Sequence, residues 1–150
     1  MLIRSLIQFL AIIVTGLAVI APGAHLFELP GKIHMSGDDY FVVQRIYLGW
    51  WIVGLLLPLS FLANLALAAT VRHDTPAFWL AVAAAALIAV NLVIFVLWTQ
   101  PVNTITENWA VRLENWQALR RQWEYSHAVN AGVTFLAFCA ATIAALRAAG

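Results

Sequence analysis

Apolar side chains follow one another in four long runs, and polar or charged side chains gather in the stretches between them. The runs cover residues 6–21, 47–70, 77–99 and 128–146, and the second and third contain no charged residue. About 20 apolar residues are enough to cross a bilayer as a helix. Because lipid offers no hydrogen-bond partner to the backbone, each run is expected to be helical. The pattern predicts an all-α integral membrane four-helix bundle that forms a single domain over residues 1–150.

Composition supports this prediction and excludes several functions. Hydrophobic residues make up 63% of the chain and charged residues 10%, whereas a soluble domain is nearer half apolar and a quarter charged. The net charge is +1, so no nucleic-acid partner is expected, and the lipid bilayer is the predicted surrounding. The single cysteine, Cys139, excludes an internal disulfide and a paired-thiol redox site.

The distribution of cations gives two opposing signals for the orientation. The side of the first and third connections holds five Lys or Arg residues, and the side of the termini holds three. A plain count places the first of these sides in the cytoplasm. However, the five lie among acidic residues that can pair with them, whereas Arg4, Arg72 and Arg147 are more isolated. We therefore expect both termini in the cytoplasm, in a multi-pass protein of a bacterial inner membrane.

The connections between the runs differ in their predicted structure. Residues 22–46 are expected to form a long first loop, and residues 71–76 a tight turn. In the third connection, Thr104 and Glu107 have the spacing of a helix capping box. No Gly or Pro follows until Gly132, so we predict one helix from about Ile105 into the fourth run. Its first half would be an amphipathic extension of the bundle.

Three tryptophans, Trp109, Trp116 and Trp123, lie seven residues apart in this predicted extension. Seven residues are close to two helical turns, so the indoles would form one stripe. Continued along the helix, the stripe reaches His127 and Asn130. It suits either an interfacial aromatic belt or packing seam, or one wall of an aromatic pocket. Asn64 and Asn91, in the second and third runs, are expected to join helices by hydrogen bonds.

Two His–Glu pairs lie where the first and fourth runs meet the same side of the membrane. His25 and Glu28 form a His-x-x-Glu, and Glu124 and His127 form a Glu-x-x-His. Di-iron four-helix bundles use Glu-x-x-His pairs on their helices, and imidazole with carboxylate suits iron, zinc or copper. The candidate metal ligands are His25, Glu28, His34, Glu124 and His127. The cofactor alternatives are none, a transition metal, or haem.

A metal-free acid–base site is the other interpretation of the same residues. His127 would act as a general base with Glu124 as its partner, and Asn103 or Asn130 would donate a hydrogen bond to a developing enolate oxygen. An aromatic cage would hold a flat lipophilic small molecule that enters from the bilayer. The residues predicted to form it are Trp50, Trp51, Trp109, Trp116 and Trp123.

The chain also resembles the anthrone oxygenase-like family of small four-helix membrane proteins. The resemblance rests on AHLFELPGK (residues 24–32), on QRIYLGWW (residues 44–51) and on the spaced set Pro101, Asn103, Trp116, Trp123 and His127. It implies a four-helix fold and, for some members, oxidation of anthrones to anthraquinones. The family often carries an Arg three residues after the His position, where this chain has Asn130.

Three functions follow from these observations. The first is an oxygenase-type oxidoreductase that acts on a lipophilic aromatic or quinol-like substrate. The second is a metal- or haem-binding membrane protein in electron transfer. The third is a non-catalytic accessory subunit whose apolar faces dock on a larger membrane complex or on copies of itself.

Overall fold

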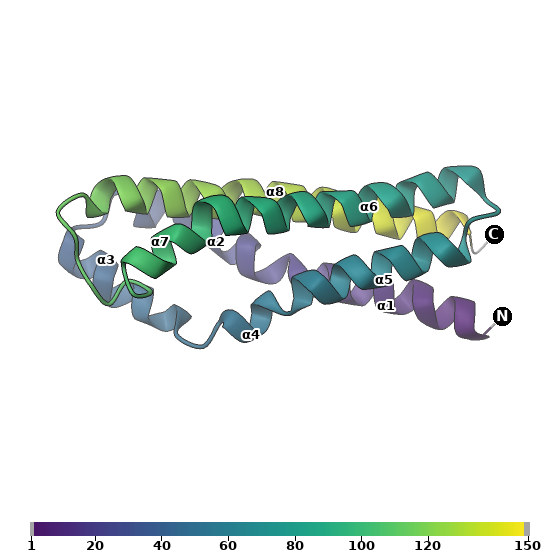
Figure 1. Cartoon of the computed structure of the whole chain (residues 1–150), viewed down its shortest axis with the longest axis horizontal. Helices are drawn as coiled ribbons and strands as arrows, with labels where there is room; N and C mark the ends of the chain where they lie inside the picture. The colour runs from purple at the N-terminus through teal and green to yellow at the C-terminus, as the bar shows by residue number, and fades with distance from the viewer. Residues whose placement is uncertain (1, 149–150) are drawn as a thin grey trace.

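The computed structural model describes residues 2–148 as a bundle of helices, with no strand in that part of the chain (Figure 1). Four helical stretches are long and apolar enough to cross a membrane, namely Leu2–Lys32, Trp51–Thr70, Thr75–Ile105 and Trp116–Arg147. The predicted all-α class and its four spans are therefore confirmed. Three of the four stretches are longer than the apolar runs that predicted them.

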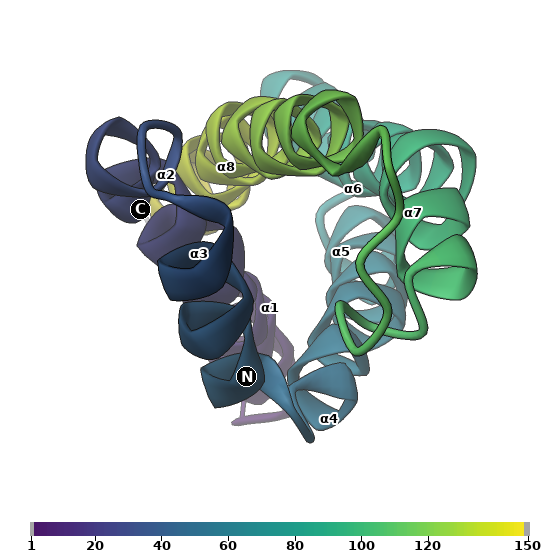
Figure 2. The same ribbon diagram turned by 90° about the vertical axis from the view of Figure 1, so that its left-hand side faces the viewer.

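The long helices form a ring in chain order. Helix α1 (Leu2–Ala18) lies beside α5 (Leu56–Thr70), α5 beside α6 (Thr75–Ile94), and α6 beside α8 (Trp116–Arg147), which returns to α1. Figure 2 shows this ring along the bundle axis. The start of α1 and the end of α8 lie at one end (Figure 1), where the Arg4 guanidinium donates to the Ala148 carbonyl.

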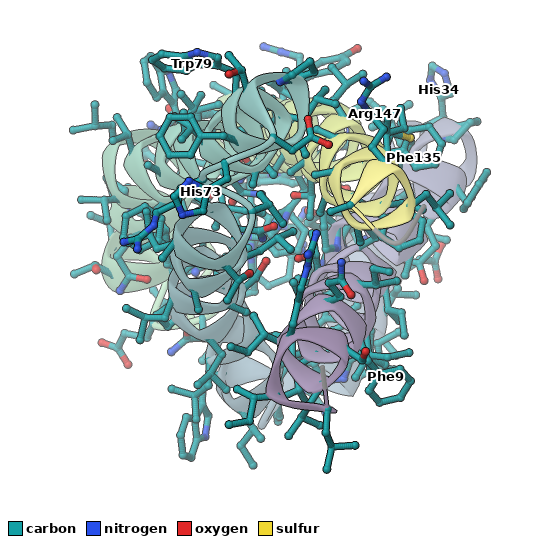
Figure 3. The ribbon with its side chains drawn as sticks, turned by 90° about the vertical axis from the view of Figure 1, so that its right-hand side faces the viewer. Phe9, His34, His73, Trp79, Phe135 and Arg147 are labelled. Carbon is teal, nitrogen blue, oxygen red and sulfur yellow. The ribbon has the colours of Figure 1, made fainter. Side chains whose placement is uncertain are left out.

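Small side chains fill the core of this terminal end. Ala11, Ala81, Ala141 and Ala144 are fully buried there, and such residues let membrane helices approach closely. The outer surface is apolar instead, with large side chains pointing away from the bundle. Figure 3 shows Phe9, Trp79 and Phe135 among them. The bundle is apolar on its outer surface and tightly packed inside, as expected of helices that lie in lipid.

Buried polar side chains join the helices at membrane depth. The Asn64 amide donates to the Thr15 hydroxyl at 2.9 Å, and the Thr15 and Ser60 hydroxyls are 2.8 Å apart. Between α6 and α8, the Asn91 amide donates to the Thr134 hydroxyl. The predicted role of Asn64 and Asn91 in joining helices is thus confirmed.

Replacing Asn64 with leucine is expected to lower the free energy of unfolding by about 1 kcal/mol, the usual size of an interhelical hydrogen bond in a membrane. The measurement is denaturation in mixed detergent micelles, followed by circular dichroism. Leu62→Ala, at an exposed position of the same helix, is the control. A loss no larger than that of the control would contradict the structural role of the amide.

The predicted first loop over residues 22–46 is wrong, because most of it is helical. Helix α2 (Ile20–Lys32) follows α1 after a turn at Val19 and contains Pro22 near its start, where a missing N–H leaves no helical bond unmade. Helix α3 (Gly37–Val43) comes next, with the Ser36 hydroxyl accepting from the Asp39 N–H at 3.2 Å. The 3₁₀ turn η1 (Gln44–Tyr47) and the short α4 (Trp51–Gly54) lead into α5.

The predicted single helix from Ile105 into the fourth span is also wrong. Helix α6 instead continues through a π-helical turn, η2 (Phe95–Thr99), into α7 (Gln100–Ile105), and α8 begins only at Trp116. Thr104 lies inside α7, where its hydroxyl donates to the Gln100 carbonyl at 3.0 Å and caps nothing. The predicted amphipathic extension is therefore divided between a loop and the first turns of α8.

Left-handed backbone explains why the helix stops there. Glu107, Asn108 and Trp109 have φ angles of 50°, 57° and 65°, a conformation that costs a non-glycine residue about 1–2 kcal/mol. The Thr106 hydroxyl accepts from the Trp109 N–H at 3.1 Å, and the Asn103 carbonyl accepts from the Asn108 N–H at 2.7 Å. These bonds, with the burial of the Trp109 indole, offset the cost. Helix propensities do not indicate such a tertiary contact, so the sequence did not predict the end of the helix.

Candidate functional site

The chain's single lysine, Lys32, is the centre of a polar cluster at the end of the bundle away from the termini. Its ammonium nitrogen lies 3.0 Å from Glu124 Oε1 and 3.6 Å from Glu28 Oε2. It also donates to the Tyr47 hydroxyl at 2.9 Å. The side chain of Lys32 is 3% exposed and that of Glu124 is 0%. Helices α2 and α8 therefore meet over a buried ion pair. Removing either charge alone would leave the other uncompensated in the interior.

A second donor reaches the same carboxylate oxygen from α3. The Tyr40 hydroxyl donates to Glu124 Oε1 at 2.9 Å and accepts from the Gln44 amide at 2.6 Å. Burial and the nearby Glu124 carboxylate raise the pKa of the Tyr40 phenol, so it remains a protonated donor. Among the described residues, Glu124 Oε2 has no hydrogen-bond partner. One oxygen of this carboxylate is thus held twice, and the other is available to accept a proton.

Tyr47 links the ion pair to the half-buried Glu28. Its hydroxyl donates to Glu28 Oε2 while it accepts from Lys32. Burial and the hydrogen bond to Glu28 raise the pKa of the Tyr47 phenol, so it too stays protonated. The Glu28 side chain is 37% exposed. The cluster therefore runs from a partly exposed carboxylate to a fully buried one.

Two histidine rings lie against each other beside this cluster. The ring centroids of His25 and His127 are 4.1 Å apart, and Trp123 contacts both, at 4.8 and 4.3 Å. The two His–Glu pairs noted in the sequence do converge. However, no hydrogen bond joins Glu124 to His127 among the described residues, and the partners of Glu124 are Lys32 and Tyr40 instead. His25 Nδ1 is buried and has no partner in that part of the chain.

The tryptophans predicted as a stripe on one helix meet by a different route. Trp116 and Trp123 lie on α8, but Trp109 comes from the loop and packs edge-on against Trp123 at 5.9 Å. Trp50 is half-buried and lies 5.9 Å from His25. Trp51, in contrast, is 72% exposed on the outer surface. Four of the five predicted indoles thus pack into one aromatic cluster.

The two predicted asparagines occupy different surroundings. Asn103 Oδ1 accepts from the Trp123 indole N–H at 2.7 Å, so the amide nitrogen of Asn103 is the part left to donate to a ligand. Asn130 is buried one turn below His127, and its backbone carbonyl accepts from Thr134 at 2.7 Å. Asn103 therefore lies at the edge of the aromatic cluster, bonded to Trp123, whereas Asn130 lies where α6 and α8 pack together.

The candidate metal ligands do not assemble into a metal-binding set. Over residues 2–148, no group of three or more His, Cys, Asp or Glu side chains is arranged to hold an ion. His34 is exposed and points away from the bundle (Figure 3). Between Glu28 and Glu124, the position suited to a cation is taken by the ammonium group of Lys32. These residues therefore form a cluster of acid–base groups with the Lys32 ammonium at its centre.

The site also contains four residues that the sequence did not predict as its members, namely Lys32, Tyr40, Tyr47 and Arg120. Arg120 is buried, donates to the Met35 carbonyl at 2.8 Å and lies over the Trp116 ring at 4.8 Å. A signal for two of these residues was present. Lys32 follows Glu28 by four residues and Arg120 precedes Glu124 by four, so each cation shares a helix face with an acid of the site. Tyr40 and Tyr47 had no such signal in the sequence, because they reach the cluster only through the turn between α2 and α3.

A groove of about 650 Å³ lies elsewhere, on the outer face between α6, η2 and α8. Its lining includes Trp98, Gln122, Tyr125 and Val129. These residues occupy a different face of α8 from Glu124 and His127. The groove is therefore a feature of the lipid-facing surface, separate from the buried cluster.

Comparison of the chain with protein-family models, with curated proteins and with solved structures gave no match. The fold and the site therefore define the class of protein on their own. It is an all-α bundle with four helices able to cross a membrane and a buried acid–base cluster at one end. The resemblance to anthrone oxygenases stays a prediction from the sequence.

Proposed function

We propose that this protein is a membrane oxidoreductase of the oxygenase type, which removes a proton from a lipophilic aromatic substrate and exposes the resulting anion to O₂. The observation that carries the proposal is the buried Glu124 carboxylate. One of its oxygens is held by Lys32 and Tyr40, and the other has no partner among the described residues. A carboxylate fixed in this way is oriented to accept a proton inside an apolar site.

The reaction balances with O₂ as the oxidant. Glu124 takes a proton from the activated CH₂ of an anthrone-like ketone, and the anion attacks O₂ to form a C–O bond. The peroxide takes up a proton, and the loss of water then breaks the O–O bond and the second C–H bond to leave a quinone carbonyl. One molecule of O₂ supplies the carbonyl oxygen and the oxygen of the water.

The aromatic residues around Glu124 suit such a substrate. Trp123 and the His25–His127 pair pack against one another beside Lys32, and aromatic molecules pack well on such rings in offset or edge-on geometry. Within residues 2–148 the amide nitrogen of Asn103 has no hydrogen-bond partner, because Trp123 bonds the amide oxygen, and it can donate to an enolate oxygen. The apolar surface of the bundle favours delivery of a lipophilic molecule from the bilayer.

The proposal is tested with purified protein in nanodiscs, a hydroxyanthrone as the probe, and O₂ uptake measured together with quinone absorbance. We expect Glu124→Gln, which keeps the shape but loses the base, to reduce kcat by about 10²- to 10⁴-fold. Glu114→Gln, an identical change at an exposed loop position, should retain the wild-type rate. No O₂ uptake by the wild-type protein above the spontaneous rate would refute the proposed function.

We also propose a bacterial inner membrane as the location, with both termini in the cytoplasm. The support is that the termini share one end of the bundle with Arg4, Arg72 and Arg147, the more isolated cations of the chain. Membrane-impermeant labelling of single cysteines in intact cells tests this orientation. In a background with Cys139→Ala, a cysteine at His73 should stay unlabelled and one at His34 should react; the reverse result contradicts the orientation.

A further inference from the structure

We propose that Glu28, Tyr47, Lys32 and Glu124 form a proton path that connects the buried carboxylate with the aqueous side of the membrane. A base buried at 0% exposure has no direct contact with water, so any proton that it exchanges with the solvent must pass through the groups that touch it. The four groups link a fully buried acid with one that is 37% exposed. Tyr47 and Lys32 thereby become proton-relay residues: Lys32 contacts the base directly, and Tyr47 contacts Lys32 and Glu28.

The contacts form an unbroken series from Glu124 to Glu28. Lys32 Nζ lies 3.0 Å from Glu124 Oε1 and donates to the Tyr47 hydroxyl at 2.9 Å. The Tyr47 hydroxyl in turn donates to Glu28 Oε2. The hydrogen bonds from Lys32 to Tyr47 and from Tyr47 to Glu28 both point outwards, which is the orientation needed to move a proton from Lys32 to Glu28. Chains of this kind polarise one another and strengthen their bonds in a low-dielectric interior.

The proton count balances around one cycle. Once Glu124 has taken up a proton, the Lys32 ammonium passes one of its protons to the Tyr47 oxygen. The Tyr47 hydroxyl proton moves to the Glu28 carboxylate, which releases it to water. The neutral Lys32 amine then recovers a proton from Glu124, and all four groups return to their starting states.

The other hydrogen bond to Glu124 provides a control within the same site. Tyr40 donates to Oε1 at 2.9 Å, which nearly equals the distance of the Lys32 contact, but it leads to the Gln44 amide. Gln44 is 3% exposed and its amide group does not release protons at ordinary pH. Tyr40 therefore orients the carboxylate, whereas the branch through Lys32 and Tyr47 ends at the partly exposed Glu28.

The test is hydrogen exchange at the Lys32 ammonium, measured by NMR on protein labelled with ¹⁵N-lysine. The chain has one lysine, so the side-chain signal needs no assignment. We expect Tyr47→Phe and Glu28→Gln each to slow exchange with water by about tenfold or more, while Tyr40→Phe and Glu114→Gln stay within about twofold of wild type. Formate in the buffer should restore part of the rate in Glu28→Gln, because a small acid can replace the missing carboxyl group.

The outcomes are distinct. Exchange that is unchanged or faster in both Tyr47→Phe and Glu28→Gln would overturn the path. An equal slowing in Tyr40→Phe would overturn it too, since that result would reflect the packing of the cluster. The role of the path in turnover rests on the proposed oxygenase function, but the exchange measurement needs no substrate. The path can therefore fail while the proposed function stands, or stand while the function fails.

Discussion

Replacement of Lys32 with methionine is expected to lower the free energy of unfolding by about 3–5 kcal/mol, the usual cost of breaking a buried ion pair from one side. Methionine fills a similar volume, so the loss comes from the charge. Glu124, fully buried, would keep the Tyr40 hydrogen bond but lose its cation. The measurement is denaturation of the purified protein in mixed micelles, followed by circular dichroism.

Two companion variants make this result specific. Lys32→Met combined with Glu124→Leu removes both charges and should recover most of the lost stability, because an apolar pair often replaces a buried ion pair at little cost. Asp38→Asn breaks the Arg112–Asp38 pair, whose carboxylate is 92% exposed, and should cost less than about 1 kcal/mol. If Lys32→Met costs no more than Asp38→Asn, the ion pair does not hold α2 on α8.

Truncation of Trp123 to alanine is expected to have a comparable effect, about 3–5 kcal/mol. The indole is 4% exposed and contacts His25, Tyr47 and His127. Its N–H also donates to Asn103 at 2.7 Å, so it joins α8 to α7. The alanine variant therefore loses packing against α2, η1 and a neighbouring ring of its own helix, together with a hydrogen bond to α7.

Trp123→Phe separates the two contributions, since it keeps most of the aromatic packing and loses the hydrogen bond. We expect it to cost about 1–2 kcal/mol, near the value for one buried hydrogen bond. Trp79→Ala, at a site that is 62% exposed on α6, should change stability little. Equal losses for Trp123→Ala and Trp79→Ala would show that the aromatic cluster contributes nothing to the fold.

The helical class and the four spans could be predicted because the reasons for them are local. A run such as residues 77–99 has no charge, and in lipid an apolar segment of this length must form its hydrogen bonds within itself. The convergence of the His25–Glu28 pair with the Glu124–His127 pair could be predicted for a related reason. Because successive spans run in opposite directions, both pairs lie at one end of the bundle, and the His25 and His127 rings meet there.

Other features depended on contacts that no local pattern records. The capping-box spacing of Thr104 and Glu107 predicted a helix start, but left-handed backbone at Glu107 through Trp109 lets the loop bury its indole. Residues 22–46 contain Pro and Gly, which suggested a loop. The helix nevertheless continues to Lys32 because α2 packs against α8.

The sequence by itself determined that this protein is an all-α bundle able to cross a membrane four times, with its chemically capable side chains at one end. Hydrophobic length and the hydrogen-bonding needs of the backbone are sufficient for that conclusion. The tertiary structure alone decided the partners within the site. Lys32 lies between Glu28 and Glu124 because α2 and α8 pack side by side. A buried carboxylate is costly without a cation or a hydrogen-bond donor beside it, and only the packing of these helices supplies both.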